Sequence, residues 1–187
     1  MGGRIQDPGS GIQHLFEASS SGTLPTMIRV EGVRKRYPGA EVDVLKDVDL
    51  EVGQGDFVSI VGRSGSGKTT LLNLVGALDG SFKGSISVAN TKLGSLDDAA
   101  ASAFRSRTVG FVFQAYHLLE HLNCRENVAL AALFAREAGS TAAAEVRRRA
   151  DDLLQEVGLD GYGLRRPGSL SGGERQRVAL ARALAPE

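Results

Sequence analysis

Alternating and continuous apolar runs predict strands in the first part of the chain. Residues 28–33 alternate apolar with charged or small residues, and Val44 to Val61 begins with a similar alternation at Val44-Leu45, Val48, Leu50 and Val52. The end of that stretch, Phe57–Val61, is apolar except for Ser59 and predicts a buried strand. Shorter runs predict a strand at 84–88 and another buried strand at 109–113.

Helical periodicity takes over between and after these strands. Residues 68–78 are apolar on nearly every side, which predicts a helix packed deep in a core, and 97–107 predicts an exposed helix. A capping-box pattern at Asn123-Cys124-Arg125-Glu126 predicts a helix that continues to about Arg136. A further helix is expected over 142–157, with Gly158 as its C-terminal cap. Its apolar face consists of Val146, Ala150, Leu153, Leu154 and Val157.

The first 26 residues differ in character from the rest. They are rich in Gly and Ser and show no sustained apolar periodicity, so residues 1–26 are expected to be a disordered tail. Residues 27–187 then form one domain, in line with the length of the chain. Met27 opens the first strand, so two interpretations stay open: translation starts at Met27, or the tail is a genuine part of the protein.

Composition excludes several classes of function. Lys plus Arg and Asp plus Glu both number 22, so the chain has no net field that would draw it to nucleic acid, and no nucleic-acid partner is expected. Its longest apolar stretch, 128–135, is far shorter than the roughly 20 residues of a membrane span. Cys124 is the single cysteine, which excludes an internal disulfide; it is expected to be a small buried apolar residue.

A glycine-rich motif follows the predicted strand at 57–61 and precedes the predicted helix at 68–78. Gly62-Arg63-Ser64-Gly65-Ser66-Gly67-Lys68-Thr69 fits G-x-x-x-x-G-K-[ST], and the strand-to-helix context is that of a P-loop. Glycines let successive backbone N–H groups converge on a phosphate, while the lysine meets the β- and γ-phosphates and the following hydroxyl reaches Mg²⁺. The expected phosphate-binding residues are Gly62, Arg63, Ser64, Gly65, Ser66, Gly67, Lys68, Thr69 and Thr70.

A second motif, Leu170-Ser171-Gly172-Gly173-Glu174-Arg175-Gln176, continues into the helical pattern 177–184. It resembles the signature sequence of ATP-binding cassette (ABC) ATPases. By itself the motif also predicts a helix capped by Ser171, and the two interpretations are compatible. The resemblance implies that signature residues bind the γ-phosphate of ATP held by a second subunit, in a head-to-tail homodimer. The corresponding positions are Ser171, Gly172, Gly173 and Gln176.

Two further positions follow from the resemblance. Tyr37 lies upstream of the P-loop, where family members place an aromatic ring that stacks on adenine. Gln114 ends the predicted strand at 109–113 and matches the glutamine that touches Mg²⁺ and the attacking water. The resemblance thus implies Lys68 and Gln114 as catalytic residues, and Thr69 and Gln114 as metal ligands. ATP and Mg²⁺ are the cofactors it implies.

The resemblance covers residues 28–187 and implies the α/β P-loop NTPase fold of ABC ATPases, with an antiparallel β subdomain and a helical subdomain at about 115–170. Segments such as residues 71–79 most resemble those of the lipoprotein-releasing, macrolide-exporting and cell-division branch of the family. The implied function is that of a transporter's ATP-binding subunit, cytoplasmic and held at the inner face of the cell membrane by a separate permease. The permease contact is expected near 114–123, although core packing equally explains the apolar residues there.

The family's Walker B carboxylates, D-loop and switch histidine have no counterpart in the sequence. His14, His117 and His121 all precede the signature and are expected to be tail or surface residues. We therefore expect the 187-residue chain to fold poorly and to hydrolyse ATP negligibly. A sequence fragment and a real short form both remain open. The alternative functions are a soluble ABC ATPase acting on DNA or ribosomes, and a truncated ATP binder without hydrolysis.

Overall fold

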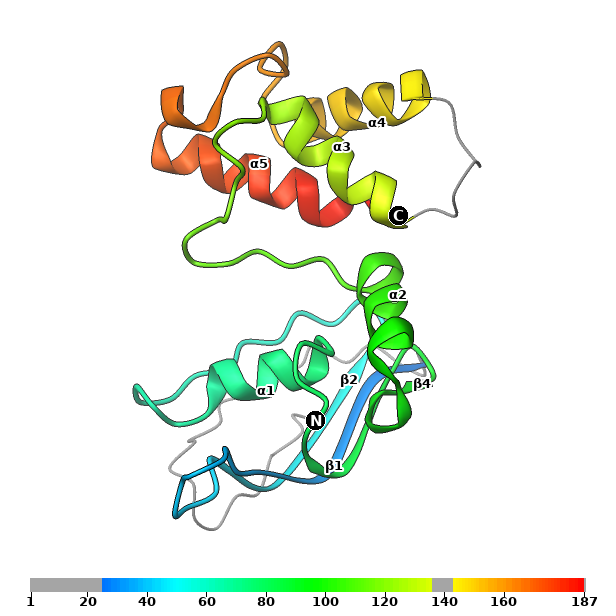
Figure 1. Cartoon of the computed structure of the whole chain (residues 1–187), viewed down its shortest axis with the longest axis vertical. Coiled ribbons are helices and arrows are strands. Elements are labelled where there is room, and N and C mark those ends of the chain that lie inside the picture. Colours follow the sequence, from blue (N-terminus) through cyan, green and yellow to red (C-terminus); the bar gives the residue numbers. More distant parts are fainter. Residues whose placement is uncertain (1–24, 136–142, 187) are drawn as a thin grey trace. The chain divides into compact units, whose positions relative to one another are not determined.

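The computed structural model describes residues 25–135 and 143–186, which fall into two units (Figure 1). The first unit ends at Ala101 and the second begins at Ser102. Nearly all of the predicted tail, including His14, lies outside the described residues, as does Arg136 at the end of a predicted helix. The helical subdomain expected at about 115–170 falls within the second unit.

An antiparallel sheet forms the framework of the first unit. It consists of β1 (Thr26–Lys35), β2 (Leu45–Gly53), β3 (Lys83–Val88) and β4 (Thr91–Lys92), in the order β2-β1-β3-β4 (Figure 1). The first three strands are confirmed predictions, whereas the two-residue β4 was not expected. Val30 in the central strand β1 pairs with Leu50 of β2 and Ile86 of β3, and all three side chains are buried. The alternation along each strand thus gives the sheet one buried face.

Helix α1 (Lys68–Val75) contacts β3 of this sheet. The predicted helix is confirmed, but the prediction that it is buried on nearly every side is wrong. Leu71 and Leu74 are fully buried, while Leu72 is 56% and Leu78 44% exposed. A helix that packs on a sheet buries one stripe, so its remaining apolar residues stay at the surface within this unit.

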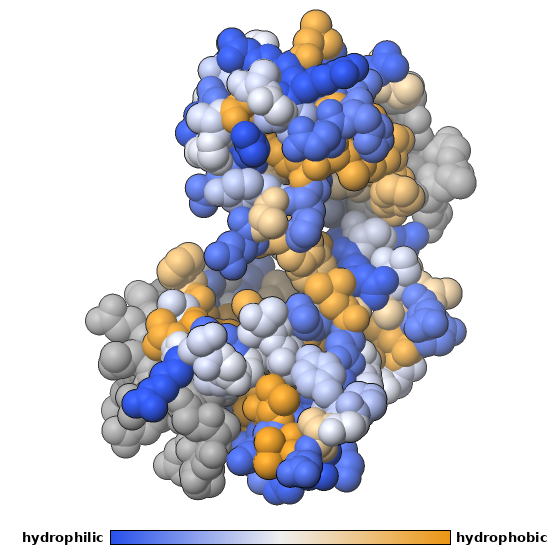
Figure 2. Space-filling view, turned by 60° about the vertical axis from the view of Figure 1, so that its left-hand side comes forward, coloured by the Kyte–Doolittle hydropathy of each residue, from blue (hydrophilic) through white to orange (hydrophobic). Residues whose placement is uncertain are grey.

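Two predicted buried strands are not formed. Phe57–Val61 has no ladder partner in the described sheet, and Phe57 is 88% exposed. Val109–Phe113 is not a strand either, and its Val112 is 46% exposed. Apolar runs predict that a segment can be buried, but a strand also needs a neighbour to share backbone hydrogen bonds. Figure 2 shows apolar side chains at the surface of both units.

Helices make up the second unit. Helix α2 (Asp98–Thr108) crosses the boundary between the units in sequence and follows a short 3₁₀ turn, η1 (Leu93–Ser95). Helices α3 (Cys124–Ala135), α4 (Ala143–Glu156) and α5 (Gly172–Leu184) follow, with η2 (Pro167–Ser169) before α5. These helices are confirmed predictions. The capping box is also confirmed: the Asn123 N–H donates to Glu126 at 2.8 Å, and the Glu126 N–H donates to Asn123 Oδ1 at 2.9 Å.

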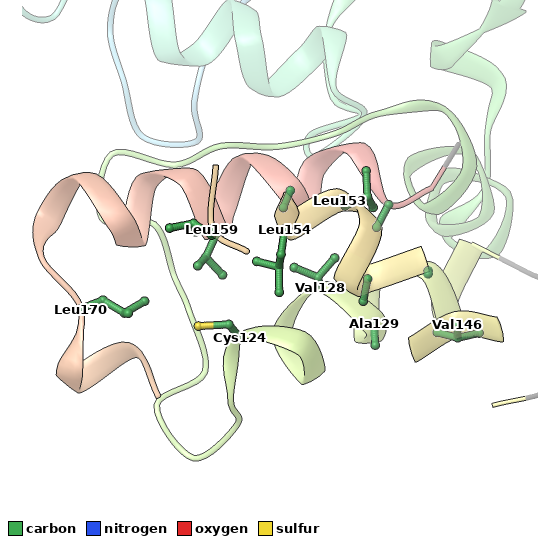
Figure 3. Packing of buried hydrophobic residues seen from close by; sticks show 13 residues of the cluster. Cys124, Val128, Ala129, Val146, Leu153, Leu154, Leu159 and Leu170 are labelled. Atoms are coloured by element: carbon green, nitrogen blue, oxygen red, sulfur yellow. The ribbon is translucent and has the colours of Figure 1, made fainter. Parts of the chain in front are cut away.

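The core of the second unit lies among α3, α4 and α5, which contact one another pairwise. Figure 3 shows their apolar side chains converging there, with Cys124 among them. Cys124 is fully buried, and this burial raises the pKa of its thiol, so its predicted role as a small apolar core residue is confirmed. The predicted face of α4 is largely confirmed, because Val146, Ala150 and the two leucines after them are buried.

Within residues 25–135 and 143–186, the helices are too short or too polar for any of them to span a bilayer.

Candidate nucleotide-binding site

Gly67 shapes the junction between the glycine-rich motif and α1. It is the N-cap of α1 with φ of 92°, and its carbonyl accepts a hydrogen bond from the Leu71 N–H at 2.8 Å. A Cβ at this position would lie 2.7 Å from Leu45 Cδ2 and 3.0 Å from the Val44 carbonyl oxygen. The left-handed backbone and the close approach of β2 both require glycine here. The motif is thereby fixed at the start of the helix.

Lys68 is held by its own loop. Its ammonium nitrogen donates to the carbonyl oxygens of Gly62 at 3.0 Å and Arg63 at 2.7 Å. The ammonium group therefore lies directly over the motif, at the N-terminal end of α1, where the helix dipole favours an anion. Both acceptors are neutral carbonyl oxygens, so they hold the ammonium group without neutralising its charge.

Two polar features of the motif fit a bound phosphate. Ser66 Oγ is buried and has no hydrogen-bond partner among the described residues, which is costly unless a ligand or water satisfies it. In the same part of the chain, α1 begins without a side-chain cap, so its first N–H groups remain available to an anion. Together with Lys68, these groups suit the polyphosphate of ATP.

Thr69 and Thr70 follow Lys68 in the first turn of α1. Thr69 is exposed, whereas Thr70 is 8% exposed and its Oγ1 lies 3.3 Å from the Tyr37 hydroxyl. The described residues include no cluster of three His, Cys, Asp or Glu side chains able to hold a metal ion. A Mg²⁺ ion here would therefore depend on the Thr69 hydroxyl and the phosphate oxygens, a donor set that Mg²⁺ accepts when bound with a nucleotide.

Tyr37 is supported by residues that the sequence analysis missed. Lys35 is 3% exposed, and its ammonium nitrogen lies 4.9 Å from the centre of the Tyr37 ring. The same nitrogen pairs with Asp79 at 2.6 Å and donates to the Ser81 carbonyl oxygen. One face of the ring is thus covered by a cation, while the side chain is 39% exposed. Lys35 lies two residues after the buried Val33 in β1, so the alternation of the strand turns its side chain inward as well. A lysine at an inward-facing position was the signal in the sequence that could have revealed this contact.

Gln114 lies in the second unit, at the corner of a turn. The Tyr116 N–H donates to the Phe113 carbonyl oxygen at 2.9 Å, so Gln114 and Ala115 are the central residues of this turn. The Gln114 side chain is exposed. Leu118, further along, packs partly against the core cluster, while Leu119 is 38% exposed. His117 and His121 are exposed, as expected of surface residues.

The signature motif forms the start of α5. Ser171 is the N-cap: its Oγ accepts from the Glu174 N–H at 3.3 Å, and its own N–H donates to Glu174 Oε2 at 2.7 Å. The Ser171 backbone N–H, with help from the Ser171 side chain and Tyr162, lowers the pKa of Glu174 to about 2. The predicted cap is confirmed. Gly172, Gly173 and Gln176 are exposed beside it.

The candidate residues form two groups. Tyr37 and residues 62–70 belong to the first unit, while Gln114 and the signature residues belong to the second. Tyr37, Thr70 and the motif lie together in the first unit through the hydroxyl contact and the shared helix. Each group presents backbone N–H groups at the start of a helix, which is a favourable place for anions.

The chain is similar to known proteins over most of its length. The family model described as "ABC transporter" matches residues 45–187. The chain is 44% identical over 160 residues to the lipoprotein-releasing system ATP-binding protein LolD of Chromohalobacter salexigens, covering 84% of this chain and 66% of that protein. It is 46% identical over 159 residues to the macrolide export ATP-binding/permease protein MacB of Chromobacterium violaceum, covering 84% of this chain and 24% of that protein.

Solved structures give the same result. A dimeric post-hydrolysis structure of the ATP-binding cassette MJ0796 bound to ADP and Pi is similar with a TM-score of 0.77 and 40% identity, covering 86% of this chain and 70% of that one. The chain therefore belongs to the ABC transporter family and has the P-loop NTPase fold of its ATPase cassettes. It spans about two thirds of the LolD relative and about a quarter of the MacB relative. The similarity to the lipoprotein-releasing and macrolide-export branch is confirmed.

Proposed function

We propose that this chain is the ATP-binding subunit of an ABC transporter of the lipoprotein-releasing and macrolide-export type. The observation that carries the proposal is the arrangement at the start of α1, where Lys68 and the unpartnered Ser66 hydroxyl surround an uncapped helix N-terminus. Tyr37 lies near the same helix through its contact with Thr70 and offers a ring face for adenine. These features match a nucleoside triphosphate better than a smaller anion.

The chain's residues act by binding and orienting the nucleotide. The amides of residues 62–67 would hold the β-phosphate, and Lys68 would neutralise charge at the β- and γ-phosphates. The Thr69 hydroxyl would be one ligand of Mg²⁺, and the resemblance to the family implies Gln114 as a second. When bound with the nucleotide, Mg²⁺ would supply positive charge that offsets the negative charge of the phosphates. Hydrolysis of ATP in the assembled transporter then follows from positioning and electrostatic stabilisation, as in other phosphoryl-transfer enzymes.

The signature residues serve a second copy of the chain. Gly172 and Gly173 are exposed at the start of α5, where their N–H groups can meet the γ-phosphate of ATP on a neighbouring P-loop. A head-to-tail homodimer around two ATP molecules results. Its support is that the similar cassette MJ0796 was solved as a dimer, in one case bound to ADP and Pi.

The remaining partner is a membrane permease. LolD is named as the ATP-binding protein of a lipoprotein-releasing system, and MacB as an ATP-binding/permease protein. We expect residues 114–123 to face this permease, which would hold the chain at the cytoplasmic side of the membrane. Leu122 and Asn123 at the end of this segment line a groove of about 440 Å³ together with Leu130 and Leu133 of α3.

Binding of a fluorescent ATP analogue to the purified chain tests the nucleotide site. Lys68→Ala should weaken Mg·ATP binding by at least about 100-fold, because a charge-assisted phosphate contact is lost from a partly buried site. Lys92→Ala, at an exposed lysine of β4, removes the same charge and should bind normally. Equal affinity of the Lys68→Ala and Lys92→Ala variants would contradict the proposed site.

Sedimentation of the chain with Mg·ATP tests the dimer. Ser171→Arg should leave nucleotide affinity of the monomer unchanged, because the signature motif is proposed to meet the nucleotide of a neighbouring chain. It should abolish ATP-dependent dimers, because a bulky cation then occupies the place of the γ-phosphate. ATP-dependent dimers of Ser171→Arg with wild-type stability would refute the head-to-tail arrangement.

A further inference from the structure

The second and third residues after Gln114 in the sequence have an unusual backbone conformation. Tyr116 has φ of 60° and His117 has φ of 47°, so two consecutive L residues adopt the left-handed region. This region is unfavourable for bulky side chains and persists where surrounding contacts enforce it. The strain begins at the last residue of the turn of Phe113 to Tyr116 that carries Gln114.

Arg182 of α5 supplies such contacts. Its two terminal guanidinium nitrogens donate to the carbonyl oxygens of His117 at 2.6 Å and Tyr116 at 2.5 Å. The planar guanidinium presents its donors in a fixed fork, so it sets the direction of both carbonyl groups at once. Arg182 is partly buried, and this burial lowers the pKa of the guanidinium. The side chain is therefore held in place rather than free in solvent.

Other contacts attach the same segment to α5 and to itself. Gly110 lies so close to Ala183, the residue after Arg182, that a Cβ on Gly110 would be 2.2 Å from the Ala183 carbonyl oxygen. The His117 ring packs edge-to-face on Phe113 with 5.1 Å between ring centres. The Gln114 turn thus lies between two attachments to the C-terminal part of α5. The signature motif begins the same helix.

We propose that Arg182 is a positioning residue that holds the turn of Gln114 in register with the signature helix through the carbonyl groups of Tyr116 and His117. This inference rests on the proposed function for its consequence at the nucleotide. Arg182 touches neither ATP nor Mg²⁺. It fixes the position of the backbone turn from which the Gln114 side chain extends. A displacement of α5 is then transmitted to Gln114, because the fork contacts two adjacent peptide groups.

Hydrogen exchange on the 187-residue chain tests the contact itself. In Arg182→Met, the amides of Tyr116 and His117 should exchange at least about tenfold faster, since their turn loses its outer anchor. Arg182→Lys keeps the charge but lacks the fork, so it should give a smaller increase. Arg148→Met, at an exposed arginine of α4, serves as the matched control and should leave these amides unchanged. Peptides from α3 and α4 report whether the unit stays folded.

ATP binding with and without Mg²⁺ tests the consequence. Arg182→Met should reduce the gain in affinity that Mg²⁺ gives, while ATP affinity without Mg²⁺ stays as in wild type. In a Gln114→Ala background, Arg182→Met should cause no further reduction, because the effect of Arg182 on Mg²⁺ acts through the Gln114 side chain. This non-additivity is a result that a merely structural role of Arg182 would not produce.

Three results would overturn the proposal. These are unchanged exchange of the Tyr116 and His117 amides in both Arg182 variants, an unchanged gain from Mg²⁺ in Arg182→Met, or an equally large further loss in the Gln114→Ala background. If the wild-type chain binds no ATP, the proposed function fails instead. The exchange comparison then still decides whether Arg182 holds the turn.

Discussion

The ammonium nitrogen of Lys35 lies 2.6 Å from a carboxylate oxygen of Asp79, joining the end of β1 to the segment that follows α1. The Lys35 side chain is 3% exposed and that of Asp79 is 24% exposed. Ser81 completes the arrangement, because its carbonyl accepts from Lys35 and its N–H donates to Asp79. The pair thus connects the strand that precedes Tyr37 to the helix that begins with the P-loop.

Lys35→Met should destabilise the chain by about 1 to 3 kcal/mol, because the Asp79 carboxylate is left partly buried without its cation. The effect is smaller than for a fully buried pair, since water still reaches Asp79. Urea unfolding measures the change. The exposed pair of Arg29 and Glu51 is the matched control, and Arg29→Met should cost less than about 1 kcal/mol. Equal costs for the two variants would show that burial of Lys35 is unimportant.

The same pair predicts a dependence on pH. Burial alone would raise the pKa of Asp79, but hydrogen bonds from Lys35 and the Ser81 N–H outweigh burial and lower it below its ordinary 3.8. A lowered pKa contributes stability that is present above pH 3.8 and is lost as the pH falls through the lower folded-state value. Lys35→Met should therefore reduce the loss of stability in this acidic range. A pH series of urea midpoints tests it.

Gly67→Ala should destabilise the first unit by about 2 to 4 kcal/mol, because a left-handed alanine is strained and its Cβ also meets β2. Gly55→Ala separates these two causes, since Gly55 has φ of 80° but open space around its Cβ. We expect about 1 to 2 kcal/mol for that control. Thermal unfolding of both variants provides the comparison, and equal values would mean that the contact with Leu45 relaxes without cost.

Glu174 should titrate at about 2, well below its ordinary 4.5, so the capping box of α5 stays formed until the pH falls through that value. Carbon-detected NMR of the Glu174 carboxyl measures the titration. Ser171→Pro removes the N–H donor, and φ of −65° at Ser171 suits proline, as does the extended backbone of Leu170. In that variant the pKa should move up toward 4.5. An unmoved pKa would assign the shift to another donor.

Gly110→Ala should destabilise the second unit by about 1 to 3 kcal/mol, because its Cβ would overlap the Ala183 backbone. Gly168→Ala is the control, since the nearest atom to its Cβ is a Glu120 carboxylate oxygen at 3.6 Å. Chemical labelling of the buried Cys124 thiol during urea unfolding reports on this unit specifically. Equal labelling of the two variants would show that α5 moves aside.

Local signals in the sequence were sufficient for the helices and the antiparallel strands. The Asn123 and Ser171 caps, the face of α4 and the alternation in β2 each arise from neighbouring residues, which the sequence displays directly. The two glycine motifs were also found in this way. Their chemistry depends on short spacing and on the start of a helix, both of which are local properties.

The remaining features depend on residues far apart in sequence. Phe57–Val61 has the composition of a strand, but its formation requires a partner that composition does not reveal. Lys35 and Asp79 meet across the first unit, and Arg182 reaches carbonyl groups 65 and 66 residues away. No periodicity predicts that a lysine in β1 or an arginine in α5 will find such acceptors. These contacts become visible once the elements are packed.

In the capping box the Ser171 hydroxyl oxygen is held by the Glu174 N–H, while its hydrogen can turn toward the Glu174 carboxylate or away from it. The oxygen accepts from Glu174 with a lone pair, while a hydroxyl can donate its hydrogen at the same time. An acceptor in front of α5 would therefore meet a hydroxyl whose oxygen is already anchored and whose hydrogen alone has to rotate. Helix stability and recognition of a neighbour's phosphate would thus draw on opposite sides of one oxygen atom, so selection for either would preserve the same serine.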